Sequence, residues 1–184
     1  MICYLIRHGK DDNSVRGGWS DTPLTEQGIT EVEALAKALA SDPSMCITEL
    51  FSSDLKRAKQ TAEIIASKLD LKIHYLPQFR EVNNGVLAGM KNDAAKEKYP
   101  NLFWNTLDWN ERYPNGESPC QFFERVSFAW KQFKEMVRDK GSNIALITHG
   151  GVINVIYHIE QGLPYSNKNK PFSVKPATIV SFEI

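Results

Sequence analysis

The chain has 184 residues, 42% of them hydrophobic, and its 22 basic and 22 acidic side chains give a net charge of zero. This length and composition predict one domain with one substantial core, and the balanced charge argues against a protein that binds nucleic acids or a membrane surface. The three cysteines lack metal-ligand spacing, no apolar run is long enough to span a membrane, and no signal peptide precedes the first strand, which together predict a cytoplasmic protein.

The first predicted element is a buried strand that ends at Arg7 and His8. Residues 2–6 form a short apolar run, and Gly9 and a polar loop over residues 10–23 follow it. Open α/β sheets bind ligands at the carboxyl ends of their strands, so Arg7 and His8 are candidate ligand contacts. The alternative is a surface arginine and histidine beside a turn, and later segments decide between the two.

A helix and a second strand are predicted between residues 25 and 51. Thr25 is expected to cap a helix whose apolar residues keep helical spacing, and Pro43 closes that region. The apolar residues 47–51 predict the strand. Residues 52–54, with the sequence Ser-Ser-Asp, are expected to cap the helix that follows.

The next helix and strand again bring charged side chains to the sheet edge. Arg57 falls in the first turn of the helix that follows residues 52–54, close to the end of the preceding strand. Residues 72–79 predict a third strand, and Glu81 lies two residues beyond it.

Residues 82–118 are predicted to form a cap-like insert over the sheet edge, within a single domain of residues 1–184. A short helical piece over 92–99 precedes an aromatic-rich stretch that contains Trp104 and Trp109. Two interpretations stay open. The rings form a satellite core that pins the insert to the sheet, or one of these tryptophans lines the substrate pocket and stacks on the leaving group.

The remaining elements are a long amphipathic helix after Pro119, an apolar strand over 144–147, a helix after Gly151 and a last strand over 177–182. Strands that alternate with helices imply an α/β fold, namely a three-layer α/β/α sandwich with a mostly parallel central sheet. His149 follows the strand over 144–147 and therefore lies at the same edge as the earlier strand ends.

The predicted strand ends carry a set of residues that suits phosphoryl transfer. Arginines bind phosphoryl oxygens through two parallel hydrogen bonds, and a histidine whose other ring nitrogen is fixed can attack phosphorus. A second histidine and the amides of a helix N-terminus at Gly150 can neutralise the equatorial charge, and a carboxylate can protonate the leaving oxygen. No metal is required by this scheme. The residues are Arg7, His8, Arg57, Glu81 and His149.

The chain resembles the histidine phosphatase superfamily, which includes cofactor-dependent phosphoglycerate mutase. The matching motifs occur in the family's order and are LIRHG at 5–9, GWSDTPLT at 18–25, SSDLKRAKQTA at 52–62, NGES at 115–118 and THGG at 148–151. The resemblance implies a phosphoglycerate mutase-like fold and a phosphohistidine formed on His8. It also implies that Arg7, Arg57 and His149 bind the phosphoryl group and that Glu81 donates the proton.

Two segments depart from the family pattern. The flank of Glu81 lacks the usual aromatic and acidic residues, so Glu117 is the substitute proton donor, with a purely structural place at a helix N-terminus as its alternative. After Gly9 the family's asparagine comes one residue early, as Asn13, which reaches the phosphoryl oxygens if the loop is shorter. Asp11 and Asp12 are expected to be solvated.

Three functions are compatible with this resemblance. The first is hydrolysis of a small-molecule phosphate ester without a metal or cofactor, the second is a phosphoglycerate mutase-type transfer, and the third is non-catalytic binding of a phosphorylated ligand. A non-catalytic domain is expected to have lost a catalytic histidine or arginine, and a mutase needs extra cations for a second acidic group. Residues 82–118 hold one arginine, three lysines and several aromatics, which favours the phosphatase. The substrate and the oligomeric state stay open, with a homodimer as one option.

Overall fold

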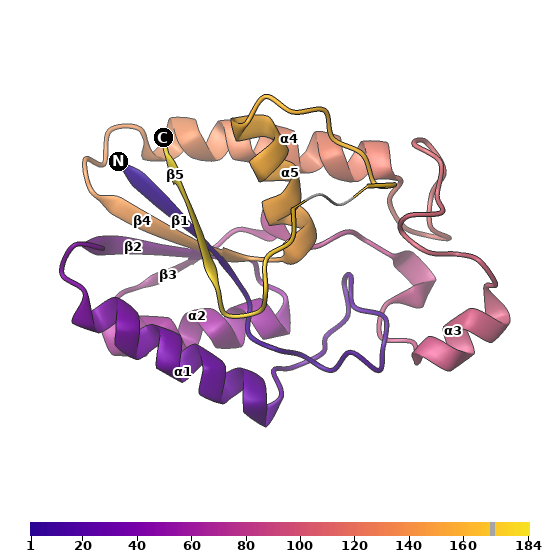
Figure 1. Cartoon of the computed structure of the whole chain (residues 1–184), viewed down its shortest axis with the longest axis horizontal. Helices are drawn as coiled ribbons and strands as arrows, with labels where there is room; N and C mark the ends of the chain where they lie inside the picture. Colours follow the sequence, from indigo (N-terminus) through magenta and orange to yellow (C-terminus); the bar gives the residue numbers. More distant parts are fainter. Residues whose placement is uncertain (170–171) are drawn as a thin grey trace.

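In the computed structural model, which describes residues 1–169 and 172–184, a five-stranded sheet forms the middle layer (Figure 1). Its strand order is β3-β2-β4-β1-β5, and the first four strands in that order are parallel. Only β5 runs antiparallel, along the free edge of β1. The carboxyl ends of the four parallel strands therefore meet at one edge of the sheet. The strands are β1 (Ile2–Arg7), β2 (Ile47–Ser52), β3 (Ile73–Tyr75), β4 (Asn143–Thr148) and β5 (Ile179–Glu183).

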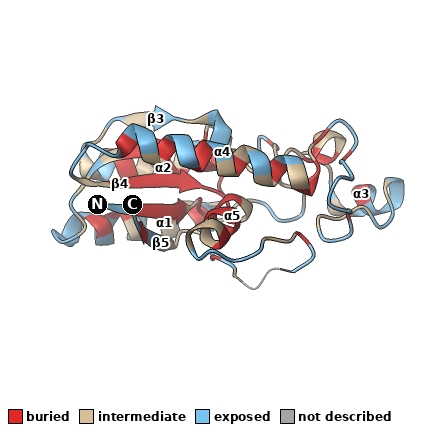
Figure 2. Ribbon diagram, turned by 90° about the horizontal axis from the view of Figure 1, so that it is seen from above, coloured by how far each residue is buried: buried red, intermediate tan, exposed pale blue. Residues whose placement is uncertain are grey.

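Helices cover both faces of this sheet, which confirms the predicted three-layer α/β/α sandwich. Figure 1 shows α4 (Pro119–Val137) and α5 (Gly150–Glu160) above the sheet, with α1 (Glu26–Ser41) and α2 (Lys56–Leu69) below it. Seen from above, the buried residues concentrate in and against the sheet (Figure 2). None of the described helices is both long and apolar enough to cross a membrane.

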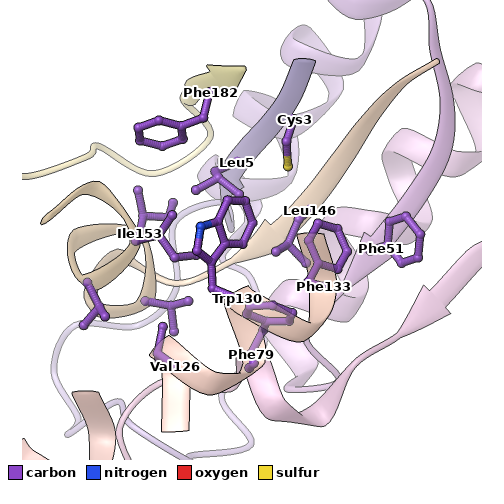
Figure 3. Packing of buried hydrophobic residues seen from close by; sticks show 14 of the residues in the cluster. Cys3, Leu5, Phe51, Phe79, Val126, Trp130, Phe133, Leu146, Ile153 and Phe182 are labelled. Atoms are coloured by element: carbon purple, nitrogen blue, oxygen red, sulfur yellow. The ribbon is translucent and has the colours of Figure 1, made fainter. Parts of the chain in front are cut away.

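The core has two halves because alternate residues of a strand point to opposite faces. On one face Leu5 and Leu146 pack with Trp130 and Phe133 of α4, as Figure 3 shows. On the other face Ile6 packs with residues of α1 and α2. Both halves consist of buried hydrophobic residues, so the strand ends that carry the site are held on a packed frame.

Local sequence explains where α1 and α4 begin. Thr25 caps α1 by accepting a hydrogen bond from the Gly28 amide at 3.1 Å, as predicted. Ser118 caps α4 through reciprocal hydrogen bonds with Gln121. By contrast, α2 begins after Leu55 without a side-chain cap, so the prediction that residues 52–54 cap it was wrong.

The third strand is shorter than the predicted residues 72–79. Of this range only residues 73–75 form a strand, β3, which pairs with β2, and a 3-10 helix, η1 (Pro77–Phe79), follows. Proline has no amide hydrogen to donate to a ladder and its φ angle is fixed, so Pro77 ends the strand.

The segment over residues 82–118 packs around its own small apolar cluster. It contains a 3-10 helix, η2 (Gly85–Leu87), and the short helix α3 (Asn92–Lys98), which lies apart from the layered part of the molecule in Figure 1. Buried Leu87, Ala95, Leu107 and Tyr113 form the cluster. Trp104 packs against both this cluster and the main core, so it joins the two.

Candidate active site

His8 is buried directly after β1 and both of its ring nitrogens have partners. Its Nδ1 lies 2.7 Å from the carbonyl oxygen of Gly9, and its Nε2 lies 3.2 Å from the Nε of Arg57. A carbonyl oxygen can only accept, so Nδ1 carries the proton and Nε2 presents its lone pair. Burial, and then the charge of Arg57, hold the pKa of His8 well below its usual range. The ring is therefore neutral and nucleophilic at Nε2.

Arg57 is placed by the first turn of α2 and is almost completely buried, with 2% of its surface exposed. Its Nη2 donates to the carbonyl oxygen of Gly18 at 2.8 Å, and its Nη1 donates to that of Ser20 at 3.2 Å. The loop before α1 thus orients the guanidinium, and Nε faces His8. Burial lowers the pKa of Arg57 from its usual value, but a guanidinium remains charged at neutral pH.

Arg7 and His149 each hold one buried nitrogen without a protein partner. Arg7 donates from Nη1 to the Val174 carbonyl oxygen at 2.6 Å, and His149 Nε2 lies 2.8 Å from the hydroxyl of Ser53. Among the residues that the structure describes, the buried Arg7 Nε and His149 Nδ1 have no hydrogen-bond partner. Buried polar atoms are normally paired, so these two nitrogens are available to an anion. His149 Nδ1 is a donor in the tautomer in which the Ser53 hydroxyl donates to Nε2. Burial, and then Arg57, hold the pKa of His149 well below its usual range.

Glu81 reaches the same place from the chain segment after η1. Its Oε2 accepts a hydrogen bond from the Gly151 amide at 2.9 Å, and its Oε1 accepts one from its neighbour Val82 at 3.1 Å. A Cβ at position 151 would clash with this carboxylate, so only glycine allows the approach. The amide of Gly151 thus binds Glu81, whereas the sequence had suggested the amides after Gly150 for phosphoryl oxygens. Gly150 itself packs against the Arg7 guanidinium.

Glu117 is engaged in a structural ion pair. Both of its oxygens accept hydrogen bonds from Arg125, at 2.6 and 3.0 Å, and Oε2 also accepts from the amide of Asn83 at 2.8 Å. Arg125 in turn donates to the carbonyl oxygens of Arg80 and Glu81 at 3.0 and 3.1 Å. The pair therefore holds the backbone that carries Glu81, and the structural alternative for Glu117 has the support of this geometry.

The loop after Gly9 differs in part from expectation. Asn13 is exposed at the rim of the cavity that Arg7 and His8 line, and its backbone oxygen accepts a hydrogen bond from Asn92 at 2.7 Å. Asp12 is exposed as predicted. Asp11 is not, because its carboxylate lies 3.4 Å from Arg57 Nε with its side chain 20% exposed, and burial raises its pKa. The prediction that Asp11 is solvated was wrong, since the sequence could not show that the loop folds back over Arg57.

The predicted residues enclose one small polar cavity. Its volume is about 230 Å³, and its lining includes Arg7, His8, Arg57 and Glu81. His149 is not part of this lining, but its ring centroid lies 5.1 Å from that of His8. Within residues 1–169 and 172–184, no three His, Cys, Asp or Glu side chains gather closely enough to hold a metal ion. Two arginines, two histidines and one carboxylate at this spacing can bind a phosphoryl group, attack it and move a proton.

The sequence did not reveal the residues that orient this set. Ser53 positions His149 and Arg125 positions the Glu81 backbone, although the two partners lie 96 and 44 residues apart in the chain. Trp19 adds a third contact, since its Nε1 donates to the Glu81 carbonyl oxygen at 2.6 Å. The sequence gives one usable signal for these residues, the position of Ser53 directly after a strand, but the same position is typical of a helix cap.

Comparisons with known proteins agree on one family. A model of the histidine phosphatase superfamily (branch 1) matches residues 3–184. A relative from Escherichia coli O1:K1 / APEC, named "Probable phosphoglycerate mutase GpmB", is 36% identical over 171 residues, which cover 88% of this chain and 75% of that protein. The alpha-ribazole phosphatase of Shigella flexneri has a TM-score of 0.84 and 26% identity, covering 100% of this chain and 91% of that one. A mycobacterial glucosyl-3-phosphoglycerate phosphatase has a TM-score of 0.80 and 25% identity, covering 98% and 88%.

Proposed function

The chain belongs to the histidine phosphatase superfamily, and from this premise we propose that it is a phosphomonoester hydrolase that works through a phosphohistidine at His8. One observation carries the proposal. A neutral His8, whose Nε2 accepts a hydrogen bond from Arg57, lines a cavity together with Arg7 and Arg57. Close to it, two buried nitrogens, Arg7 Nε and His149 Nδ1, have no partner among the described residues. A dianionic phosphoryl group would satisfy both donors and Arg57 together.

The geometry supports a two-step reaction. In the first step Nε2 of His8 bonds to phosphorus, the bond from phosphorus to the ester oxygen breaks, and the protonated carboxyl of Glu81 gives its proton to the leaving alcohol. In the second step Glu81 takes a proton from water, the resulting hydroxide bonds to phosphorus, and the nitrogen–phosphorus bond breaks. Arg7, Arg57 and His149 stabilise the charge on the equatorial oxygens throughout.

Phosphoglycerate mutase-type transfer is the second candidate, and the name of the Escherichia coli relative favours it. Such a reaction requires cations for the carboxylate of its substrate. The single arginine of the insert, Arg112, donates from Nε to the Gly116 carbonyl oxygen at 3.0 Å, and Lys96 and Lys98 are exposed on α3. These contacts favour the hydrolase, as do the two phosphatases named above.

An assay of phosphate release from a panel of phosphomonoesters, with EDTA present, tests this proposal. The wild type should release phosphate, and His8→Ala should lose activity by a factor on the order of 10⁴ or more while its melting temperature stays close to that of the wild type. Turnover of 3-phosphoglycerate to its 2-isomer without phosphate release would favour the mutase. Activity that appears only after divalent ions are restored, or that survives in His8→Ala, would contradict the mechanism.

A further inference from the structure

A second cavity adjoins the catalytic cavity at Glu81. Its volume is about 210 Å³, and Glu81 and Gly151 belong to its lining together with residues of the insert, of α4 and of the segment after α5. Glu81 is the proposed proton donor, so the atom that it protonates is the oxygen of the leaving group. A leaving group bonded to a phosphoryl on His8 therefore extends from this carboxylate, and the second cavity is the space that it can enter.

Three aromatic rings form the apolar walls of this cavity: Trp104, Phe122 and Tyr165. The ring of Trp104 meets that of Phe122 edge-on, with 5.5 Å between centroids. Tyr165 stacks on Phe123 at 5.2 Å. These contacts fix the rings before any ligand binds, which reduces the entropy that binding would cost.

The segment after α5 is tied to the insert, so the two walls keep their spacing. The side-chain amide of Asn167 donates to the carbonyl oxygens of Trp104 and Leu107, at 2.7 and 2.8 Å. On the other side of Trp104, Tyr113 stacks on its ring at 6.3 Å. The cavity is thus a built feature of the fold and joins parts of the chain that are 60 residues apart.

The lining of this cavity contains one acidic side chain and no basic one among the described residues. Glu81 is its single charged side chain among the described residues, and Asn154, Ser166 and Asn169 supply uncharged polar groups. Burial, and then the charge of Glu81, raise the pKa of Tyr165, so its hydroxyl stays neutral. A carboxylate or second phosphate in this cavity would face the negative charge that Glu81 gains as it gives up its proton, and the described lining holds no cation to compensate. Such a pair of like charges is unfavourable at low dielectric.

We propose that this cavity binds the leaving group of the substrate, and that the leaving group is an uncharged alcohol with an aromatic ring. Flat walls offer stacking and edge-on contacts to a ring, and the amides and the hydroxyl of Ser166 can bind one polar substituent. Pockets for drug-sized ligands span about 300–1,000 Å³, so this smaller cavity suits one ring or two fused rings. The inference rests on the proposed hydrolase function and adds the substrate class to it.

Two esters that differ in one charge test the neutrality of the leaving group in the wild-type protein. Benzyl phosphate should exceed 4-carboxybenzyl phosphate in kcat/KM by about tenfold, because the added carboxylate would face Glu81. Asn169→Lys places a cation at the exposed rim and should narrow that ratio, whereas Gln132→Lys, on the outer face of α4, should leave it unchanged. Equal kcat/KM for the two esters in the wild type would overturn the proposal.

Trp104 and Trp109 of the insert provide a test variant and its control for recognition of an aromatic leaving group. Trp104 lines the cavity, whereas Trp109 is 38% exposed and lies outside the lining. Trp104→Leu should lower the kcat/KM ratio of benzyl phosphate to glycerol 1-phosphate by about fivefold, and Trp109→Leu should not. Equal ratios in both variants would show that Trp104 belongs only to the core. If Trp104→Leu does not fold, the two-ester comparison still decides.

The same assays distinguish a failure of the proposed hydrolase function from a failure of the proposed leaving group. A folded wild type that hydrolyses none of the three esters contradicts the hydrolase and this inference together. A wild type that hydrolyses all three at equal kcat/KM, and loses this activity in His8→Ala, keeps the hydrolase and overturns the aromatic leaving group.

Discussion

The two cavities that meet at Glu81 are built from different parts of the chain and hold opposite kinds of side chain. The catalytic cavity takes Arg7, His8 and Arg57 from strand ends and from the first turn of α2. The leaving-group cavity takes its rings from the insert, from α4 and from the segment after α5, and apart from Glu81 its described lining is uncharged. The first is fixed mainly by strand ends and by the start of α2, and the second by the insert, the helices α4 and α5, and the segment after α5.

This difference separates reaction chemistry from substrate choice. Side chains at the ends of parallel strands are positioned by the rigid sheet, so their spacing suits one reaction. Segments outside the sheet tolerate changes in sequence and length, and binding specificity commonly resides in them. We therefore expect changes in the catalytic cavity to affect all substrates alike, and changes in the second cavity to affect the ratio between substrates.

Arg57→Lys gives the largest effect in this comparison. Lysine keeps the charge but loses the planar guanidinium, which forms two parallel hydrogen bonds. The resulting loss in kcat/KM should correspond to about 2–4 kcal/mol of transition-state stabilisation. The loss should be the same for benzyl phosphate and glycerol 1-phosphate, because both share the phosphoryl group. Arg112→Lys, in the insert, is the control and should change kcat/KM little. If Arg57→Lys leaves kcat/KM almost unchanged, or lowers it for only one of the two esters, the proposed division between reaction chemistry and substrate choice is wrong.

A smaller effect is expected in the pH dependence of stability. Burial lowers the pKa of His8 and His149, so below pH about 6.5 the unfolded chain binds protons that the folded chain does not. The free energy of unfolding should therefore fall as the pH falls through this window. Each histidine contributes at most about 1.4 kcal/mol per pH unit, which corresponds to one proton.

Urea denaturation at several pH values between 5 and 7.5 measures this dependence. His8→Gln should show a shallower fall in the free energy of unfolding than the wild type. His149→Gln should have the same effect, because burial lowers the pKa of His149 as well. If His8→Gln and the wild type have the same slope, His8 is not held neutral by the fold.

The sequence was sufficient for the order of strands and helices along the chain, because hydrophobic periodicity is a local signal, but not for the end of β3 or the start of α2. It placed Arg7, His8, Arg57, Glu81 and His149 at one edge. The structure brings the first four around one cavity and His149 against the ring of His8. The sequence failed where a side chain is oriented by a partner far along the chain. The fold of the loop over Arg57 and the contact of Ser53 with His149 depend on tertiary packing that periodicity does not encode.

The aromatic residues of the insert also show that sequence alone cannot identify contacts between distant segments. Composition singled out Trp104 and Trp109, but only the structure separates the ring that lines a cavity from the one that does not. Tyr165 and Phe122, which complete the walls, lie in a later segment and in α4, where they resembled ordinary loop and core residues. A cavity assembled from three separate segments leaves no pattern in any one of them.

The location of phosphate on the enzyme tests the central claim most directly. Wild type mixed briefly with substrate and quenched in alkali should carry one acid-labile phosphate, and peptide mapping with ³¹P NMR should place it on Nε2 of His8. That nitrogen is expected because Nδ1 donates its proton to the Gly9 carbonyl oxygen. Phosphate on Nδ1, on another residue, or on no residue during steady turnover would contradict the account.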